Sequence, residues 1–248
     1  MNSQYSRRRL IIMPAHNEAL NLPLVLPAIR AVAADYDLLV IDDGSKDNTA
    51  DVARSLGATV ISLPVNLGYG GAVQTGFRFA VYNDYDLAVV MDADGQHDPA
   101  GITDLAQAVG LGKADIAIGS RFRGGLEYQV PWIKRTGMTM FAWIASRIIG
   151  QTLTDPTSGF QALNAAVLRY VAFDNYPVDF PDVDTLLTLH FAGFRITEVP
   201  VTMRPRISGT SMHSGWKPFY YVAKMSLSIA IVLLRQQGNP KHKGSEAP

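Results

Sequence analysis

The feature of this chain that most restricts its fold is an alternation of short apolar runs with longer segments of helical spacing. The runs expected to be strands are Leu10–Met13, Leu38–Ile41, Thr59–Leu63, Leu87–Met91 and Ile116–Ile118. Short, nearly continuous apolar runs are typical of strands that are buried on both faces of a parallel sheet. The segments expected to be helices between them are Glu18–Ala34, Asp47–Leu56, Gly71–Val81 and a helix starting at Asp98-Pro99. This βαβ repetition predicts an α/β fold with an open, mostly parallel sheet and helices on both faces.

The second half of the chain is less regular. The elements expected there are a helix over Trp132–Ile149, a helix over Phe180–Ala192, a strand over Ile196–Met203, a loop over Arg204–Trp216 and a helix over Pro218–Arg235. No internal repeat and no linker composition divides the chain. We therefore expect one domain over residues 1–216, an amphipathic C-terminal helix over 217–235 and a disordered polar tail over 236–248.

Composition excludes several classes of function. Among 248 residues, 22 Lys and Arg balance 22 Asp and Glu, so no net field points to nucleic acid as a partner. Absence of cysteine excludes disulfides and thiolate metal sites and fits a cytoplasmic setting. The apolar run after Arg7-Arg8-Arg9 is too short for an export signal. The apolar stretch Phe219–Leu234 is interrupted by Lys224 and is shorter than the about 20 residues that a spanning helix needs.

Polar clusters directly follow three of the expected strands. They are His16-Asn17-Glu18, Asp42-Asp43-Gly44-Ser45 and Asp92-Ala93-Asp94. In open parallel sheets, ligands bind beyond the carboxyl ends of the strands, where these clusters are expected to meet. Acidic groups that converge there repel one another unless a cation or hydrogen-bond donors lie between them. The sequence therefore predicts a ligand site at this edge.

Asp92 and Asp94 have the pattern of a divalent metal site. Two carboxylates two residues apart at the end of a strand can lean to one side, and Gln96 adds a further oxygen. Magnesium and manganese prefer oxygen ligands and often complete their shell with substrate phosphate. The alternative is that these carboxylates only form a turn and cap the next helix. In the same way, Asp42 to Ser45 suits either a nucleoside's base or ribose, or a helix-entry turn.

Four segments in order resemble family 2 glycosyltransferases. They are Met13-Pro14-Ala15-His16-Asn17-Glu18, Asp42-Asp43-Gly44-Ser45, Asn66-Leu67-Gly68-Tyr69-Gly70-Gly71 and Asp92-Ala93-Asp94-Gly95-Gln96-His97. The chain is similar in particular to the dolichol-phosphate mannose synthase-like branch, which includes bacterial enzymes that glycosylate undecaprenyl phosphate. The resemblance runs from about Leu10 to Arg235 and implies a GT-A fold.

The resemblance also implies roles for individual positions. Donor binding is expected from Pro14, Ala15, Glu18, Asp43, Asp92 and Asp94, and a Mg²⁺ or Mn²⁺ ion from Asp92, Asp94 and Gln96. Arg206 is the expected contact to the donor diphosphate, since a guanidinium pairs with phosphate oxygens in a bidentate manner. Contacts to an acceptor phosphate are expected from Arg121, Lys134 and Arg135. For each of these cations a solvated surface position remains the alternative.

Asp155 lies in the segment Thr154-Asp155-Pro156-Thr157-Ser158-Gly159-Phe160-Gln161, which resembles the acceptor-side motif of the family. It is a candidate catalytic base toward a sugar hydroxyl. A phosphate acceptor is already ionised near neutral pH, and Asp155 would then orient the acceptor or a positive partner. The family often has arginine where this chain has Gln161, so part of the acceptor-side charge differs.

Glycines and histidines near these motifs do not form a phosphate loop or a histidine metal site. The segment from Gly68 to Gly71 lacks the Gly-Lys-Ser/Thr ending of a phosphate loop, and close packing at a helix start is the expected role of its glycines. His16, His97 and His213 have no metal spacing and are expected to be local hydrogen-bonding residues, with His97 nearest the metal.

The C-terminal helix bears on the partner. Lys224, Ser228 and Arg235 fall on one stripe of an otherwise apolar helix, which fits anchoring at a membrane surface. A core helix or a dimer helix is an equal alternative, and the chain could form a homo-oligomer. The overall hypothesis is a metal-dependent, inverting glycosyltransferase that moves a sugar from a nucleoside-diphosphate sugar to a polyprenyl phosphate at the inner face of the cytoplasmic membrane. The alternatives are transfer to a saccharide or other hydroxyl and a non-catalytic nucleotide-sugar-binding module.

Overall fold

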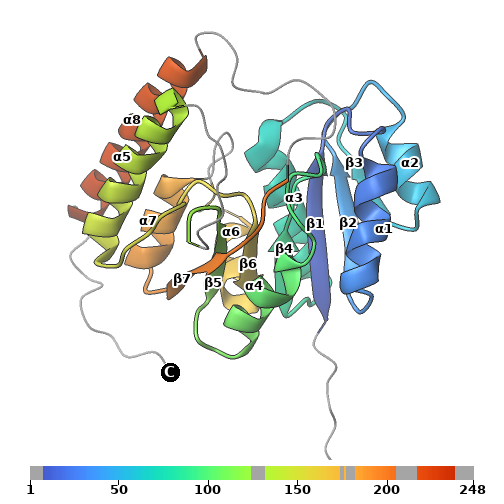
Figure 1. Cartoon of the computed structure of the whole chain (residues 1–248), viewed down its shortest axis with the longest axis horizontal. Coiled ribbons are helices and arrows are strands. Elements are labelled where there is room, and N and C mark those ends of the chain that lie inside the picture. The colour runs from blue at the N-terminus through green and yellow to red at the C-terminus, as the bar shows by residue number, and fades with distance from the viewer. Residues whose placement is uncertain (1–7, 124–131, 174–175, 177–181, 205–216, 238–248) are drawn as a thin grey trace, which may run out of the picture.

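The computed structural model describes residues 8–123, 132–173, 176, 182–204 and 217–237. One seven-stranded sheet has the order β3-β2-β1-β4-β6-β5-β7 (Figure 1). Its strands are β1 (Arg9–Ala15), β2 (Asp37–Asp42), β3 (Thr59–Ser62), β4 (Leu87–Val90), β5 (Ile116–Ser120), β6 (Gln161–Asn164) and β7 (Ile196–Pro200). All paired neighbours are parallel except β6, which runs antiparallel to both β4 and β5. The expected mostly parallel sheet is confirmed.

Helices cover both faces of this sheet, as the βαβ pattern predicted. They are α1 (Leu22–Val32), α2 (Thr49–Ser55), α3 (Gly68–Tyr82), α4 (Gly101–Gly110), α5 (Trp132–Ile149), α6 (Ala165–Val171), α7 (Val183–Phe191) and α8 (Lys217–Gln237). Successive strand residues point to opposite faces, so Leu10 and Ile12 of β1 join one core cluster and Ile11 and Met13 join the other. Helices α1, α2 and α4 belong to the second cluster, and the remaining helices to the first.

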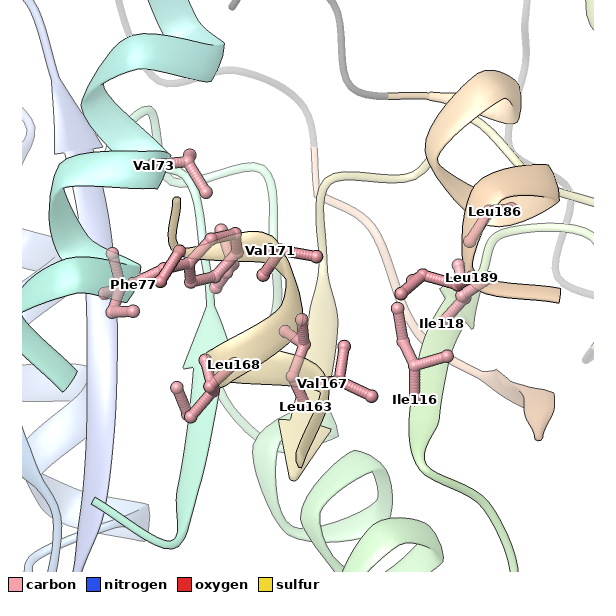
Figure 2. Packing of buried hydrophobic residues seen from close by; sticks show 14 of the residues in the cluster. Val73, Phe77, Ile116, Ile118, Leu163, Val167, Leu168, Val171, Leu186 and Leu189 are labelled. Atoms are coloured by element: carbon pink, nitrogen blue, oxygen red, sulfur yellow. The ribbon is translucent and has the colours of Figure 1, made fainter. Parts of the chain in front are cut away.

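Close packing fixes the helices of the first cluster against the sheet. Figure 2 shows Phe77 of α3 turned toward Val171 of α6, and Leu189 of α7 turned toward Ile118 of β5. A Cβ on Gly76 of α3 would lie 2.3 Å from Cγ2 of Ile12, so α3 approaches β1 more closely than a larger residue would allow. This packing holds the amino end of α3 beside the ends of β1 and β2.

Several boundaries differ from the sequence-based expectations. Helix α1 begins at Leu22 and not at Glu18, because the amides of Asn21 and Leu22 both bond to the Glu18 carbonyl in a turn. Pro23 then occupies the first helical turn, where its missing N–H costs nothing. Strand β6 and helix α6 were not expected at all, and β7 ends at Pro200 and not at Met203.

The C-terminal helix packs on the body of the protein through α7. The Ser228 hydroxyl of α8 donates to the Asp184 carboxylate of α7, and Met225 and Ile229 are buried in the first core cluster. No helix in the described part of the chain combines the length and the apolar character needed to cross a bilayer. Residues 236–237 are helical, whereas the rest of the tail expected over 236–248 lies outside the described residues. The boundary between a domain over 1–216 and a separate helix stays a prediction.

Asp184 provides a test of this α7–α8 contact. Burial raises the pKa of the Asp184 carboxyl, and hydrogen bonds from Ser228 and Thr185 offset this only in part. When the pKa of a carboxyl is higher in the folded state than in the unfolded state, the protein loses stability as pH rises from the unfolded-state pKa through the folded-state pKa. We therefore expect Asp184→Asn to match the wild-type protein near pH 4 and to be more stable by about 1 kcal/mol at pH 7. Urea unfolding at both pH values measures this, and a variant less stable at pH 7 would contradict it.

Candidate active site

The loops after β1 and β2 are joined by hydrogen bonds at the carboxyl edge of the sheet. The Asn17 amide donates to the Ser45 hydroxyl (2.9 Å), and the Asn17 side chain accepts from the Lys46 amide (2.8 Å). The Glu18 amide donates to the Thr49 hydroxyl (2.8 Å). Asn17 has a positive φ of 58°, which turns the chain back toward β2. Two of the three polar clusters therefore meet as predicted.

The residues proposed for donor binding in these loops differ in their exposure. Pro14 and Ala15 are buried in β1, and the Glu18 side chain is partly exposed and bonded to Asn21. Asp43 is 4% exposed. Its carboxylate accepts the backbone N–H groups of Leu67 (2.6 Å) and Gly68 (3.0 Å).

Asp43 therefore caps the amino end of α3, in addition to the contact with the nucleotide that is predicted for it. A carboxylate at the amino end of a helix satisfies free N–H groups and complements the helix dipole, which is why α3 begins at Gly68 and not at Gly71. Gly44 permits this approach, because a Cβ there would lie 2.7 Å from the Asn66 nitrogen. The glycine-bearing segment thus lies at the start of α3, and the close packing expected of its glycines stays a prediction.

The acidic motif forms a tight turn after β4. Asp94 is 5% exposed, and its Oδ1 accepts the Gln96 amide (2.9 Å) across Gly95, whose φ is +78°. His97 Nδ1 accepts the Asp92 amide (3.1 Å), while its Nε2 lies 3.7 Å from Asp92 Oδ2. The His97 ring is buried and stacks on Phe160 at 4.8 Å. His97 is therefore a local hydrogen-bonding residue that supports the turn.

The donor atoms of this turn suit a hard divalent cation. Asp92 and Asp94 offer carboxylate oxygens and Gln96 offers an amide oxygen, with one third of the Asp92 side chain exposed. Within the described residues, no group of three or more His, Cys, Asp or Glu side chains could hold a metal ion by itself. Magnesium commonly takes part of its shell from water and substrate phosphate, so two carboxylates and an amide are a suitable protein share.

Tyr69 links the acidic motif to the acceptor-side segment, a role that no pattern in the sequence indicates. Burial, followed by the nearby Asp92 carboxylate, raises the pKa of the Tyr69 hydroxyl well above its ordinary value. A Cβ on Gly159 would lie 2.4 Å from the Tyr69 hydroxyl oxygen and 3.5 Å from Asp92 Oδ1. The glycine of the acceptor-side segment thus lets that segment touch both residues.

We expect Gly159→Ala to displace the Tyr69 hydroxyl and to lower kcat about tenfold, because small displacements of positioned groups are costly in catalysis. Tyr69→Phe removes the oxygen that the new methyl group would meet. The alanine substitution should therefore cost less in a Tyr69→Phe background than in the wild-type protein. Steady-state kinetics on the four proteins measure this, and equal costs in both backgrounds would show that the hydroxyl is not the group displaced.

Asp155 and Arg121 form a buried ion pair. Arg121 Nε and Nη2 lie 2.6 Å from Asp155 Oδ2 and Oδ1, and the Arg121 amide also donates to Oδ2 (3.0 Å). The Asp155 side chain is fully buried, whereas 16% of the Arg121 side chain remains exposed. The structure therefore places Asp155 against a positive partner, as one of the three roles considered from the sequence requires. It brings this candidate base together with one of the candidate acceptor cations.

The other predicted cations are Arg206, Lys134 and Arg135, and their side chains lie outside the described residues. Beyond β7, Arg204 donates its amide to the Gln96 carbonyl (2.7 Å), and its guanidinium pairs with Asp98 (2.9 Å). Met203 forms an antiparallel bridge with His97. The chain is therefore fixed beside the acidic motif just before Arg206, which itself lies outside the described residues. Lys134 and Arg135 lie in the first turns of α5, but their side chains are also outside the described part.

Comparison with known proteins identifies the family. The model of glycosyl transferase family 2 matches residues 10–176. The chain belongs to glycosyltransferase family 2. Undecaprenyl-phosphate mannosyltransferase of Micrococcus luteus is 37% identical over 220 residues, which are 84% of this chain and 88% of that protein. Polyprenol monophosphomannose synthase of Mycolicibacterium smegmatis is 34% identical over 221 residues, which are 85% of this chain and 82% of that protein.

A solved structure supports the fold of this family 2 glycosyltransferase. Glucosyl-3-phosphoglycerate synthase of Mycobacterium tuberculosis, in complex with Mn²⁺, uridine diphosphate and glucosyl-3-phosphoglycerate, superposes with a TM-score of 0.67 at 20% identity. The alignment covers 94% of this chain and 81% of that one. The fold is GT-A, as the sequence resemblance implied, and the protein is an enzyme of the glycosyltransferase class. The roles of its individual site residues stay predictions.

Proposed function

We propose that this family 2 glycosyltransferase moves a sugar from a nucleoside-diphosphate sugar to the phosphate of a polyprenyl lipid, with inversion at the anomeric carbon. The observation that carries the proposal is the ion pair of Asp155 and Arg121. Asp155 is fully buried and accepts three N–H groups of Arg121, so it is poorly placed to take a proton from a hydroxyl. What this part of the site offers an acceptor is a cation, which suits an anionic acceptor such as phosphate.

The reaction with a phosphate acceptor needs no base. An acceptor phosphate oxygen, already ionised near neutral pH, forms the new bond to the anomeric carbon. The bond from that carbon to the donor diphosphate breaks, and the nucleoside diphosphate leaves with the electron pair. A single displacement of this kind inverts the anomeric configuration. Arg121 would hold the attacking phosphate in line, and its two carboxylate contacts would keep the guanidinium plane fixed.

Negative charge on the leaving diphosphate would be stabilised at the acidic turn that contains Asp92, Asp94 and Gln96. A Mg²⁺ or Mn²⁺ ion bound there would neutralise the negative charge that develops on the diphosphate. Asp92, Asp94 and Gln96 are the residues proposed to hold it, and Asp43, Glu18, Pro14 and Ala15 to surround the nucleoside. Arg206 is proposed to pair with the diphosphate, because Arg204 fixes the chain two residues earlier beside Gln96. The Mycobacterium tuberculosis structure, which contains Mn²⁺ with uridine diphosphate in the same fold, supports this arrangement.

The lipid part of the acceptor is supported by the relatives and by α8. The two relatives described above are named for undecaprenyl phosphate and for polyprenol monophosphomannose. Large apolar side chains are exposed on α8, namely Val222, Leu227, Ile231 and Leu234. Residues 227, 231 and 234 follow helical spacing and form one stripe. We propose that this stripe rests on the cytoplasmic membrane surface, which gives the active site access to a lipid phosphate.

A transfer assay tests the proposed function directly. The protein is incubated with a panel of nucleoside-diphosphate sugars and Mn²⁺ or Mg²⁺, with either undecaprenyl phosphate in vesicles or soluble saccharide acceptors. We expect radiolabelled sugar to appear in the lipid fraction, to be lost with EDTA and to be restored by added metal. The anomeric configuration of the product, read by NMR, should be opposite to that of the donor. Transfer to soluble hydroxyls alone would contradict the proposal, and would restore a hydroxyl acceptor as the better hypothesis.

A further inference from the structure

Glu198 on β7 is a buried carboxylate that the mechanism above does not use. Its side chain is fully buried. Oε1 accepts the backbone amides of Thr154 (2.8 Å) and Asp155 (2.7 Å), and Oε2 accepts the Thr154 hydroxyl (2.9 Å). A buried carboxylate is costly unless donors satisfy its oxygens. Arg123 Nη1 also lies 4.0 Å from Oε2, but the hydrogen-bond donors to the carboxylate all come from Thr154 and Asp155. Glu198 therefore fixes the backbone of these two residues against the sheet.

That backbone lies outside helices and strands. Without a ladder of hydrogen bonds, an irregular segment needs other acceptors to hold its amides in one place. The Thr154 hydroxyl also lies 2.6 Å from the Ser120 hydroxyl at the end of β5. Glu198 therefore ties the segment to β7, while Ser120 ties it to β5.

The same segment sets the position of Arg121. The Asp155 amide binds Glu198, and the Asp155 carboxylate binds the Arg121 guanidinium at two points. A shift of the Asp155 backbone would therefore move the guanidinium with it. The contact with the donor side lies farther along the chain, beyond β7, where the Arg204 amide donates to the Gln96 carbonyl. Loss of the Glu198 carboxylate should thus disturb the acceptor side and leave the donor side intact.

We propose that Glu198 is a positioning residue that sets the orientation of Arg121 toward an anionic acceptor. The inference rests on the proposed function, in which Arg121 binds the acceptor phosphate. Glu198 acts through Asp155 and touches no substrate. Its effect is therefore expected in acceptor binding, and not in donor binding.

Kinetics of Glu198 variants test this role. Glu198→Ala should raise KM for undecaprenyl phosphate about tenfold, which is the scale of one weakened charge-assisted contact, and should leave KM for the donor within about twofold. Glu198→Gln should recover part of this loss, because Oε1 can still accept the two amides. Gln151→Ala is the matched control, since Gln151, three residues before Thr154, also bonds the chain to β7. It donates to the Ile196 carbonyl (3.1 Å) and does not hold Asp155. Its acceptor KM should stay within about twofold of wild type.

Two results with Glu198→Ala would overturn the proposal. An unchanged acceptor KM in folded Glu198→Ala, or an equal rise in both KM values, would refute it. If Glu198→Ala does not fold, Glu198→Asp replaces it: the shorter carboxylate keeps its charge but draws back from the amides. Glu198→Asp should then raise the acceptor KM alone, and a wild-type acceptor KM would again refute the role.

A second readout separates this inference from the proposed function. The Arg121 Nε–H, assigned by its loss in Arg121→Lys, should give a slowly exchanging NMR signal because Asp155 holds it. That signal should broaden or vanish in Glu198→Ala and persist in Gln151→Ala. If the wild-type protein does not glycosylate the lipid, the proposed function fails, and the signal still decides whether Glu198 positions Arg121. If the lipid is glycosylated but the signal and the acceptor KM do not change in Glu198→Ala, Glu198 alone loses its assigned role.

Discussion

Replacing Asp94 by asparagine is expected to lower kcat by about 10²–10³-fold with little change in the fold, since this is the usual scale for losing one group that stabilises transition-state charge. The asparagine side chain has the same shape, and its oxygen can still accept the Gln96 amide that Asp94 accepts at 2.9 Å. What it lacks is the negative charge that a divalent cation requires of this ligand. The loss should therefore appear as weaker metal activation and slower transfer.

A metal titration separates these effects from simple damage. In Asp94→Asn, the Mn²⁺ concentration at half-maximal activity should rise while the far-UV circular dichroism and the melting temperature stay close to wild type. Asp104→Asn is the matched control, because Asp104 is exposed on α4. Full activity in Asp94→Asn at low Mn²⁺ would contradict the assignment of Asp94 as a metal ligand.

Replacing Asp155 by asparagine should have the second large effect, on both stability and acceptor binding. Asp155 accepts three N–H groups of Arg121, and asparagine would turn its own NH₂ group toward some of them. Breaking a buried ion pair by removing one partner typically costs about 3–5 kcal/mol. Because 16% of the Arg121 side chain stays exposed and can regain water, we expect a value near 3 kcal/mol, at the lower end of that range.

Kinetics distinguish a positioning role of Asp155 from a role as base. With a phosphate acceptor, Asp155→Asn should raise the acceptor KM about tenfold or more and leave the pH dependence of kcat unchanged. Arg121→Gln should raise the same KM, and the double variant should be little worse than either single one, since the two residues act as a unit. Additive losses would contradict this coupling. A loss of the acidic limb from the pH profile of kcat in Asp155→Asn would instead indicate a catalytic base.

The parallel half of the fold could be predicted from sequence because its signals are local. Each of the strands β1, β2, β4 and β5 is a short apolar run with polar residues directly after it, a pattern typical of strands that are buried on both faces. The two polar clusters after β1 and β2 were expected to meet because parallel strands end at one edge. The motifs that carry the family resemblance are local in the same way, because they lie at these strand ends. The resemblance therefore implied the GT-A fold without any knowledge of distant contacts.

Features that depend on contacts between distant residues could not be predicted in this way. Strand β6 has only two apolar residues between Gln161 and Asn164, and its antiparallel pairing depends on β4 and β5 being already in place. The pair of Arg121 and Asp155 joins residues 34 positions apart. Glu198 is the one acidic residue of strand β7, and its place opposite two backbone amides follows only from the three-dimensional fold.

The strand order also has a consequence for how the chain is made on the ribosome. Strand β4, which leads into the acidic turn, pairs on one side with β1 and on the other with β6, whose first residue follows 71 residues after Val90. At roughly 5–20 residues per second, synthesis takes about 4–14 s to cover that distance. Throughout this interval the nascent chain carries an unpaired strand edge next to Asp92. Such an edge is a ready partner for another nascent chain, so chaperones that shield strand edges should matter most for this enzyme before Asn164 has been added.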